Sequence, residues 1–147
     1  MLSRRSVIIS LSTTALVGAL AGRDRVSAAD KSVTIGIALP FTGADAHDAD
    51  LIRDGAMLAI DDTNAAGGIA GYKIGLLQLD NGTATAGQYD PAQAATNARK
   101  MVGDDSVVAT IGPQMSGSGK AMSPILSEGD LATITPSSTN PDITNPK

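Results

Sequence analysis

The 147-residue sequence contains no cysteine and a single histidine, His47, and aromatic residues make up only 2% of it. Without cysteine the chain has no disulfide, no thiolate nucleophile and no site for a lipid-modified N-terminal cysteine. With one histidine and no cysteine, the usual groups for nucleophilic catalysis are missing. The aromatic residues are Phe41, Tyr72 and Tyr89, too few for a platform on which bases or sugars stack.

Positive charge is also scarce. The chain has 11 Lys and Arg residues against 15 Asp and Glu residues, a net charge of −4 and a sequence pI near 4.7. This balance excludes the clustered basic face of a nucleic-acid binder, so no nucleic-acid partner is expected. The hydrophobic content of 42% and the mean hydropathy of +0.06 are typical of one soluble globular domain with a core.

Residues 1–29 have the organisation of an export signal. Two arginines precede an apolar stretch at 7–21, and small residues follow at the spacing of a cleavage site, at 26–29. An uncleaved membrane anchor is the alternative, but the apolar stretch carries several hydroxyl residues and is short for a span of about 20 residues. We therefore expect cleavage near Ala28 or Ala29, no stable membrane insertion afterwards, and a product in the periplasm.

The arginine pair leaves the export route open. The run from Ser3 to Ile8 contains Arg4-Arg5 and resembles a twin-arginine signal. Two arginines are also common at the start of ordinary secretory signals, although Arg23 and Arg25 so close to the cleavage site are unusual for the general secretory route. Either route carries the chain out of the cytoplasm.

Beyond the signal, strand-like and helix-like segments alternate. Short β-branched apolar runs alternate with segments in which apolar or small residues recur every three or four positions. The predicted strands are 33–39, 72–79, 106–111 and 131–135, and the predicted helices are 50–65, 91–102 and 118–128, with a long polar loop at 81–89. The order βαβαβαβ predicts an α/β fold, a three-layer, doubly wound parallel sheet with helices on both faces.

Two local signals refine these elements. Asp90 followed by Pro91 is typical of a helix start, with a capping carboxylate and proline at the first helical position. Pro124 lies inside the predicted helix at 118–128, so we expect a kink there or an earlier end to that helix.

Motifs for catalysis or nucleotide binding fail on their spacing. Gly119-Lys120 follows a predicted strand, but a phosphate-binding loop needs glycine at position 114 and Ser or Thr at position 121, where this chain has Gln and Ala. A nucleophile elbow around Ser118 would need glycines at 116 and 120, where the chain has Ser and Lys. We predict a protein that is not an enzyme and that uses no cofactor.

An acidic stretch around the single histidine is a candidate metal site. It contains Asp45, His47, Asp48 and Asp50. A calcium-binding loop needs glycine at its sixth position and glutamate at its twelfth, and neither is present. A histidine among carboxylates in a loop is more often a solvated surface, and we predict no metal site.

Two loops near the end of the sequence carry the candidate binding residues. The loops at 111–119 and 134–141 each follow a predicted strand and contain hydroxyl residues, among them Ser116, Ser137 and Thr139. The carboxyl ends of parallel strands share one edge of the sheet, where small ligands bind. Hydroxyls and free backbone N–H groups suit a small zwitterion or anion. The alternative is that these residues only cap helices and turns.

The chain also carries a set of short motifs in a fixed order. They are VTIGIALPFTG at 33–43, DGAMLAIDD at 54–62, NAAGGIAG at 64–71, DPAQA at 90–94, IGP at 111–113 and TPSSTNP at 135–141. In this order and spacing they resemble the extracytoplasmic binding proteins of the branched-chain amino acid ABC-transporter type, which are type I periplasmic binding proteins with relatives for amides and urea. The resemblance spans almost all of residues 30–147.

The resemblance implies a two-lobed protein that closes on its ligand by a hinge. Residues 30–147 would form an incomplete first lobe of that protein. It implies that Ser116 and the backbone N–H groups at Gly117 hold the α-carboxylate of the ligand. The carbonyl of Ser137 and the hydroxyl of Thr139 would meet its ammonium group, and Ser138 between them is a further candidate.

The resemblance further implies the function and the partners. The protein is expected to be the extracytoplasmic solute-binding component of an ABC importer for amino acids or related amides, and to dock on ABC-transporter permease subunits. Asp48 stands where the family often has an aromatic residue near the ligand side chain, which points toward a polar or cationic ligand. The alternatives are a ligand-sensing receptor domain, a small secreted enzyme, or an inactive truncated fragment.

Overall fold

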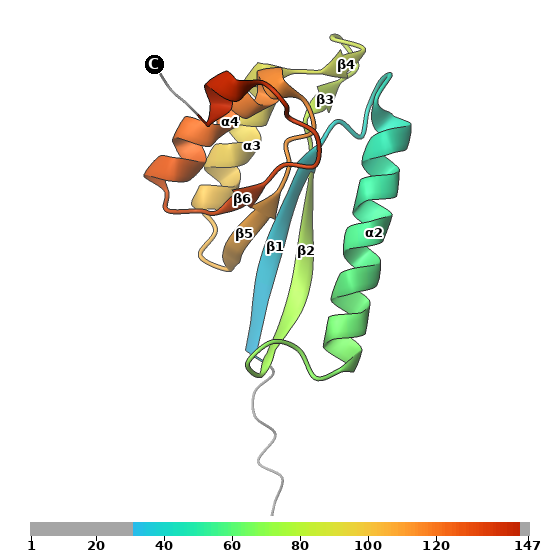
Figure 1. The fold of residues 1–147 in the computed structure, drawn as a ribbon, viewed down its shortest axis with the longest axis vertical. Coiled ribbons are helices and arrows are strands. Elements are labelled where there is room, and N and C mark those ends of the chain that lie inside the picture. The colour runs from blue at the N-terminus through green and yellow to red at the C-terminus, as the bar shows by residue number, and fades with distance from the viewer. Residues whose placement is uncertain (1–30, 145–147) are drawn as a thin grey trace, which may run out of the picture.

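The computed structural model describes residues 31–144, in which four parallel strands form one sheet (Figure 1). In order across the sheet these strands are β2 (Tyr72–Asp80), β1 (Lys31–Leu39), β5 (Val107–Ile111) and β6 (Thr133–Ile134). The parallel pairing and the strand order confirm the predicted α/β sheet. The predicted export signal at 1–29 lies outside the described residues.

Helices cover both faces of the sheet, which confirms the doubly wound arrangement (Figure 1). Helix α2 (Ala46–Ala65) lies on one face, and helices α3 (Pro91–Val102) and α4 (Ser116–Glu128) pack together on the other. A short 3-10 helix, η1 (Pro141–Ile143), follows the last strand. No helix between residues 31 and 144 combines the length and the apolar character needed to cross a membrane.

The core is divided between the two faces. The larger cluster faces α3 and α4 and consists of Ala38, Leu79, Ala94, Ala98, Met101, Val107, Met122 and Leu126. The smaller cluster faces α2 and consists of Ile37, Leu39 and Ala49. Because consecutive residues of a strand point to opposite faces, the apolar run at the end of β1 supplies both clusters.

The α2 face is the less completely covered of the two. Within the described chain, α2 packs against β2, and an apolar groove of about 350 Å³ runs between α2 and the strands β5 and β6. Its lining includes Ala59 of α2, Ala109 of β5 and Ile134 of β6. The side chain of Ile134 is 76% exposed, so part of the sheet's apolar surface remains open on this side.

Helix α3 forms where its capping signal predicts. The Asp90 carboxylate accepts hydrogen bonds from the backbone N–H groups of Ala92, at 2.8 Å, and Gln93, at 3.3 Å. Pro91 occupies the first helical position, where its missing N–H has no intrahelical partner to lose. The helix bounds agree with those predicted because local capping chemistry and apolar periodicity specify the same segment.

Helix α2 begins earlier than predicted. It starts at Ala46 rather than at residue 50, and Ala49 in its first turn is fully buried in the α2-side cluster. His47 and Asp48, expected in a loop, are therefore helical. The polar residues Asp45, His47 and Asp48 conceal the helix start in the sequence, whereas packing of Ala49 against the sheet stabilises it in the fold.

Helix α4 does not end at the proline, so the earlier end offered as one alternative for this helix is wrong. It extends from Ser116 to Glu128 with Pro124 inside it. A proline in a helix interior costs about 3 kcal/mol. Met122 and Leu126, on either side of the proline, are both buried in the larger cluster, and this packing keeps the segment helical.

The last strand is shorter than the predicted 131–135, because only Thr133 and Ile134 pair with β5 at the edge of the sheet. The polar segment at 81–89 also differs from the loop expected there. It folds into a small antiparallel hairpin of β3 (Gly82–Thr83) and β4 (Gln88–Tyr89). The hairpin stands at the carboxyl end of the parallel sheet (Figure 1).

A buried amide pair joins β1, β2 and α3. Asn81 follows β2 directly and is fully buried. Its amide nitrogen donates to the carbonyl of Ala38 at 2.9 Å, and its amide oxygen accepts from the Asn97 side chain at 2.8 Å. The Asn97 nitrogen also donates to the carbonyl of Asp80 at 2.7 Å. Because buried polar groups are costly when unpaired, these bonds specify how α3 docks on the sheet.

We expect Asn81→Ala to lower the free energy of unfolding by about 2–4 kcal/mol, because it leaves Ala38 and Asn97 with unpaired buried groups. Asn97→Ala should cost about 1–3 kcal/mol for the same reason. The double variant should lose less than the sum of the two, since they share one hydrogen bond. Urea unfolding followed by circular dichroism measures these values.

The control for this cycle is Thr96→Ala, an exposed neighbour of Asn97 on the same helix. Its free energy of unfolding should stay within about 0.5 kcal/mol of the parent value. Strictly additive losses at Asn81 and Asn97 would show that the two amides do not act as a pair.

Candidate functional site

The predicted binding loops come together at the carboxyl edge of the sheet. The segment after β5 leads into α4, and the segment after β6 lies beside it. Their contact is direct, because the backbone N–H of Asn140 donates to the hydroxyl of Ser116 at 3.3 Å. The expectation that both loops open on the same edge is therefore confirmed.

Hydroxyl groups after β6 fasten the two loops to each other. The Ser137 hydroxyl donates to the carbonyl of Gln114 at 2.9 Å, and the Ser138 hydroxyl donates to the carbonyl of Pro113 at the same distance. Thr135 also donates to the Pro113 carbonyl, at 2.6 Å. These hydroxyls hold the loops in place, and their oxygens keep lone pairs that can still accept a hydrogen bond.

Ser116, Gly117 and Thr139 lie differently from these two serines. Ser116 and Gly117 are the first two residues of α4. Thr139 is exposed, and its hydroxyl makes no hydrogen bond to another described residue. The hydroxyls of Ser116, Ser137 and Ser138 are therefore already bonded to the facing loop, whereas within residues 31–144 no such bond holds Gly117 or Thr139.

Helix α4 begins without a side-chain cap. Met115 occupies its N-cap position, and no side chain among residues 31–144 caps the first turn with a hydrogen bond. The first N–H groups of a helix have no intrahelical partner and carry a partial positive charge. In the same turn Ser118 is 1% exposed, and its hydroxyl has no hydrogen-bond partner within residues 31–144. This end of α4 is suited to an anionic group such as a carboxylate.

Tyr89 covers the start of α4 from the hairpin side. A Cβ added to Gly117 would lie 2.9 Å from the Tyr89 ring and 3.3 Å from its hydroxyl oxygen, so the ring packs directly on the glycine. The hairpin is also joined to the loop between β1 and α2, where the N–H of Ala44 donates to the carbonyl of Gly87 at 3.1 Å. No local sequence pattern predicts this position for Tyr89, because it depends on a polar segment folding back over a helix end.

A hollow of about 380 Å³ lies beside these groups, between the start of α2 and the two loops. Its lining is Asp48, Leu51, Ile52, Gln114, Pro136 and Ser137. Gln114 is 6% exposed, and its Oε1 has no hydrogen-bond partner among the described residues. In the sequence, Gln114 stands out only as a mismatch to a phosphate-binding loop, and no local pattern indicates its burial beside this hollow.

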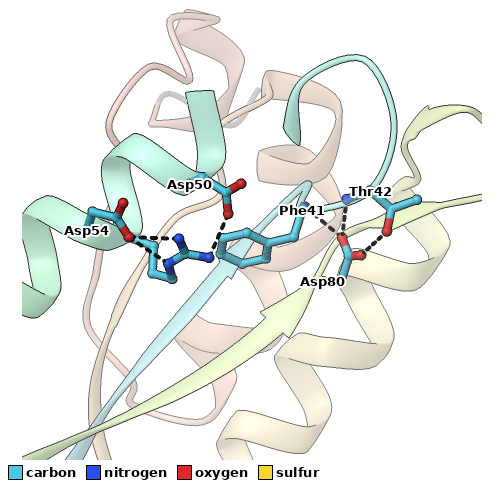
Figure 2. Close-up of polar contacts among 6 residues, drawn as sticks. Phe41, Thr42, Asp50, Asp54 and Asp80 are labelled. Carbon is cyan, nitrogen blue, oxygen red and sulfur yellow. Dashed lines mark hydrogen bonds and ion pairs between the residues drawn. The ribbon is translucent and has the colours of Figure 1, made fainter. Parts of the chain in front are cut away.

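The loop between β1 and α2 is held by Asp80 at the end of β2 (Figure 2). The Asp80 carboxylate accepts from the backbone N–H groups of Phe41, at 2.8 Å, and Thr42, at 3.3 Å. Its other oxygen accepts from the Thr42 hydroxyl at 2.6 Å. Charge-assisted bonds of this kind are stronger than neutral ones, and they set the direction in which the chain leaves β1.

Arg53 of α2 contacts the same loop through the ring of Phe41. The Arg53 guanidinium bonds to Asp50 at 2.6 Å and to Asp54 at 2.7 Å, as the dashed lines in Figure 2 show. It lies 5.9 Å from the centroid of the Phe41 ring. The hydrogen bond to Asp54, with the nearby charges of both carboxylates, raises the pKa of Arg53 above its ordinary value.

Residues 32–147 match the family model described as periplasmic binding protein. A curated amino acid binding protein of Pseudomonas aeruginosa is 39% identical to this chain over 112 residues, which are 76% of this chain and 28% of the relative. The Leu/Ile/Val-binding protein BraC3 of Rhizobium johnstonii is 37% identical over 116 residues, 79% of this chain and 30% of the relative.

Solved structures agree with these sequence matches. The branched-chain amino acid transporter substrate binding protein LivJ of Streptococcus pneumoniae, in complex with isoleucine, superposes with a TM-score of 0.70 at 31% identity. The match covers 78% of this chain and 31% of LivJ. This chain thus spans less than a third of the length of each of these three relatives.

The geometry of the loop after β5 depends on Gly112. Its φ is +112°, and an added Cβ would collide with the carbonyl oxygen of Ala38. We expect Gly112→Ala to lower the free energy of unfolding by about 2–4 kcal/mol, from the left-handed φ and the overpacking together. Urea unfolding measures the loss.

The matched control is Gly87→Ala. Gly87 also has a positive φ, +65°, but an added Cβ would meet nothing within 4 Å. Gly87→Ala should lower the free energy of unfolding only by the cost of the left-handed φ, about 1–2 kcal/mol. Equal losses for the two variants would show that close approach to Ala38 does not constrain the loop.

Proposed function

Because this chain belongs to the periplasmic binding protein family, we propose that it forms the first ligand-binding lobe of the solute-binding component of an ABC importer. The proposed ligand is an amino acid or a related amide. The observation that carries this proposal is the uncapped start of α4, with free N–H groups and hydroxyls beside the loop after β6. Such an arrangement suits a small molecule that carries both an anionic and a cationic group.

In the proposed complex, the α-carboxylate lies at the start of α4. Ser116 and the backbone N–H groups at Gly117 hold it, where the helix end is positive. The ammonium group lies on the other loop, against the carbonyl of Ser137 and the free hydroxyl of Thr139. Ser138 contributes through its hydroxyl oxygen. The Tyr89 ring over Gly117 limits the access of water to the carboxylate.

The rest of the mechanism concerns the whole protein. Since this chain spans less than a third of the relatives it matches, we propose that a second lobe closes on the ligand from the opposite side. Contacts from both sides exclude water and immobilise the ligand, which accounts for most of the affinity. Residues 1–29 direct export to the periplasm, and the closed protein delivers its ligand to the permease subunits.

The experiment is isothermal titration calorimetry of the complete gene product with a panel of L-amino acids and their amides. Ser116→Ala and Thr139→Ala should each weaken binding about tenfold or more, because each removes a hydrogen bond to a charged group of the ligand. Ser127→Ala, exposed at the far end of α4, is the control and should leave the affinity unchanged. Full affinity in both site variants would contradict the proposed placement.

A ligand-side test examines the zwitterion directly. The decarboxylated amine and the des-amino acid of the best ligand should each bind at least about 100-fold more weakly than the amino acid, since each leaves charged or polar groups of the site unpaired. An amine that binds as well as the parent amino acid would rule out a carboxylate at the start of α4.

A further inference from the structure

The hollow between α2 and the loop after β5 is placed to receive the side chain of a ligand. It shares Ser137 with the proposed ammonium site, and Ser137 is bonded through its hydroxyl to the backbone of Gln114. A ligand whose ammonium group lies against Ser137 therefore has its side chain next to Gln114. The chemistry of this hollow then selects the ligand.

Gln114 is the buried polar residue of the hollow, whereas Asp48 and Ser137 are exposed. It is 6% exposed, and its Oε1 makes no hydrogen bond to any residue of the described chain. A buried acceptor without a partner is unfavourable, and a donor that reaches it removes this penalty. An aliphatic side chain such as that of leucine cannot donate a hydrogen bond to Oε1, whereas a side chain that ends in N–H groups can.

The other residues that line the hollow also suit a ligand side chain with N–H donors on an aliphatic stem. Leu51, Ile52 and Pro136 are apolar and suit the methylene groups of a ligand side chain. Asp48, in the first turn of α2, is exposed and takes part in no ion pair within residues 31–144. The hollow thus combines apolar walls with one carboxamide and one carboxylate, both of which accept hydrogen bonds.

We infer that this lobe selects an amino acid whose side chain carries N–H donors on an aliphatic stem, with Gln114 as the specificity-determining residue. The inference rests on the proposed function, because it needs an amino acid held at the neighbouring loops. The shared chemistry is that of a terminal carboxamide, ammonium or guanidinium group. This preference differs from the isoleucine bound by the pneumococcal relative.

The test is calorimetry of the complete gene product, purified free of ligand, with L-glutamine, L-arginine and L-leucine. Glutamine or arginine should bind at least about tenfold more tightly than leucine, because only they pair the buried acceptor. Gln114→Met, which keeps the length of the side chain, should weaken their binding at least about tenfold and leave leucine within about threefold. Gln114→Glu keeps the acceptor oxygens and should preserve arginine binding.

One further variant tests the contribution of the Asp48 carboxylate to binding, and another serves as a control. Asp48→Asn should weaken arginine more than glutamine, since it removes a charge but keeps an acceptor. Gln78→Met places the same substitution on an exposed position of β2 and should change none of the three affinities. It controls for a general effect of an added apolar side chain.

The outcomes distinguish this inference from the function on which it rests. Tight leucine binding that Gln114→Met leaves unchanged, with weak binding of glutamine and arginine, would overturn the inference and leave the proposed function standing. Failure of every amino acid and amide to bind would overturn the proposed function itself. Loss of glutamine and arginine binding in Gln114→Met, with leucine affinity kept, supports both.

Discussion

The end of β2 is the point on which the rest of the lobe depends. Asp80 and Asn81 are neighbours in sequence, and their side chains serve different parts of the fold. The Asp80 carboxylate holds the segment that leaves β1, whereas the buried Asn81 amide joins that strand to helix α3 through Asn97. Parallel strands alone do not determine where their connecting loops go. These polar contacts do, because each would leave an unpaired buried or charged group if the loop moved.

The proposed binding edge rests on these contacts, and its hydroxyl residues divide into two kinds. Ser137 and Ser138 donate to carbonyls of the facing loop and keep the two loops together. The start of α4 is left without a side-chain cap, so its N–H groups remain available to a ligand. The structural and the binding interpretations of these residues are therefore complementary, since fastened loops are what keep free groups in a fixed geometry.

The lobe offers a ligand two different surfaces side by side. One is polar and charge-complementary, at the start of α4 and the loop after β6. The other is the mostly apolar hollow that contains the buried carboxamide of Gln114. In the proposed complex, the first surface holds the groups common to all amino acids, and the second faces the side chain that distinguishes one amino acid from another.

The sequence by itself determined the sheet, its order of elements, the cap at Asp90 and the two loops that meet, because periodicity and capping are local and repeat along the chain. Only the tertiary structure decided where packing overrides a local signal. Ala49 is helical where it packs in the α2-side cluster, and the segment around Pro124 stays helical because Met122 and Leu126, on either side of the proline, are buried in the larger cluster. The tertiary structure also decided the positions of Tyr89 and Gln114. Their roles depend on a hairpin folding over a helix end and on the burial of one amide, and both arise from contacts between segments that no local pattern encodes.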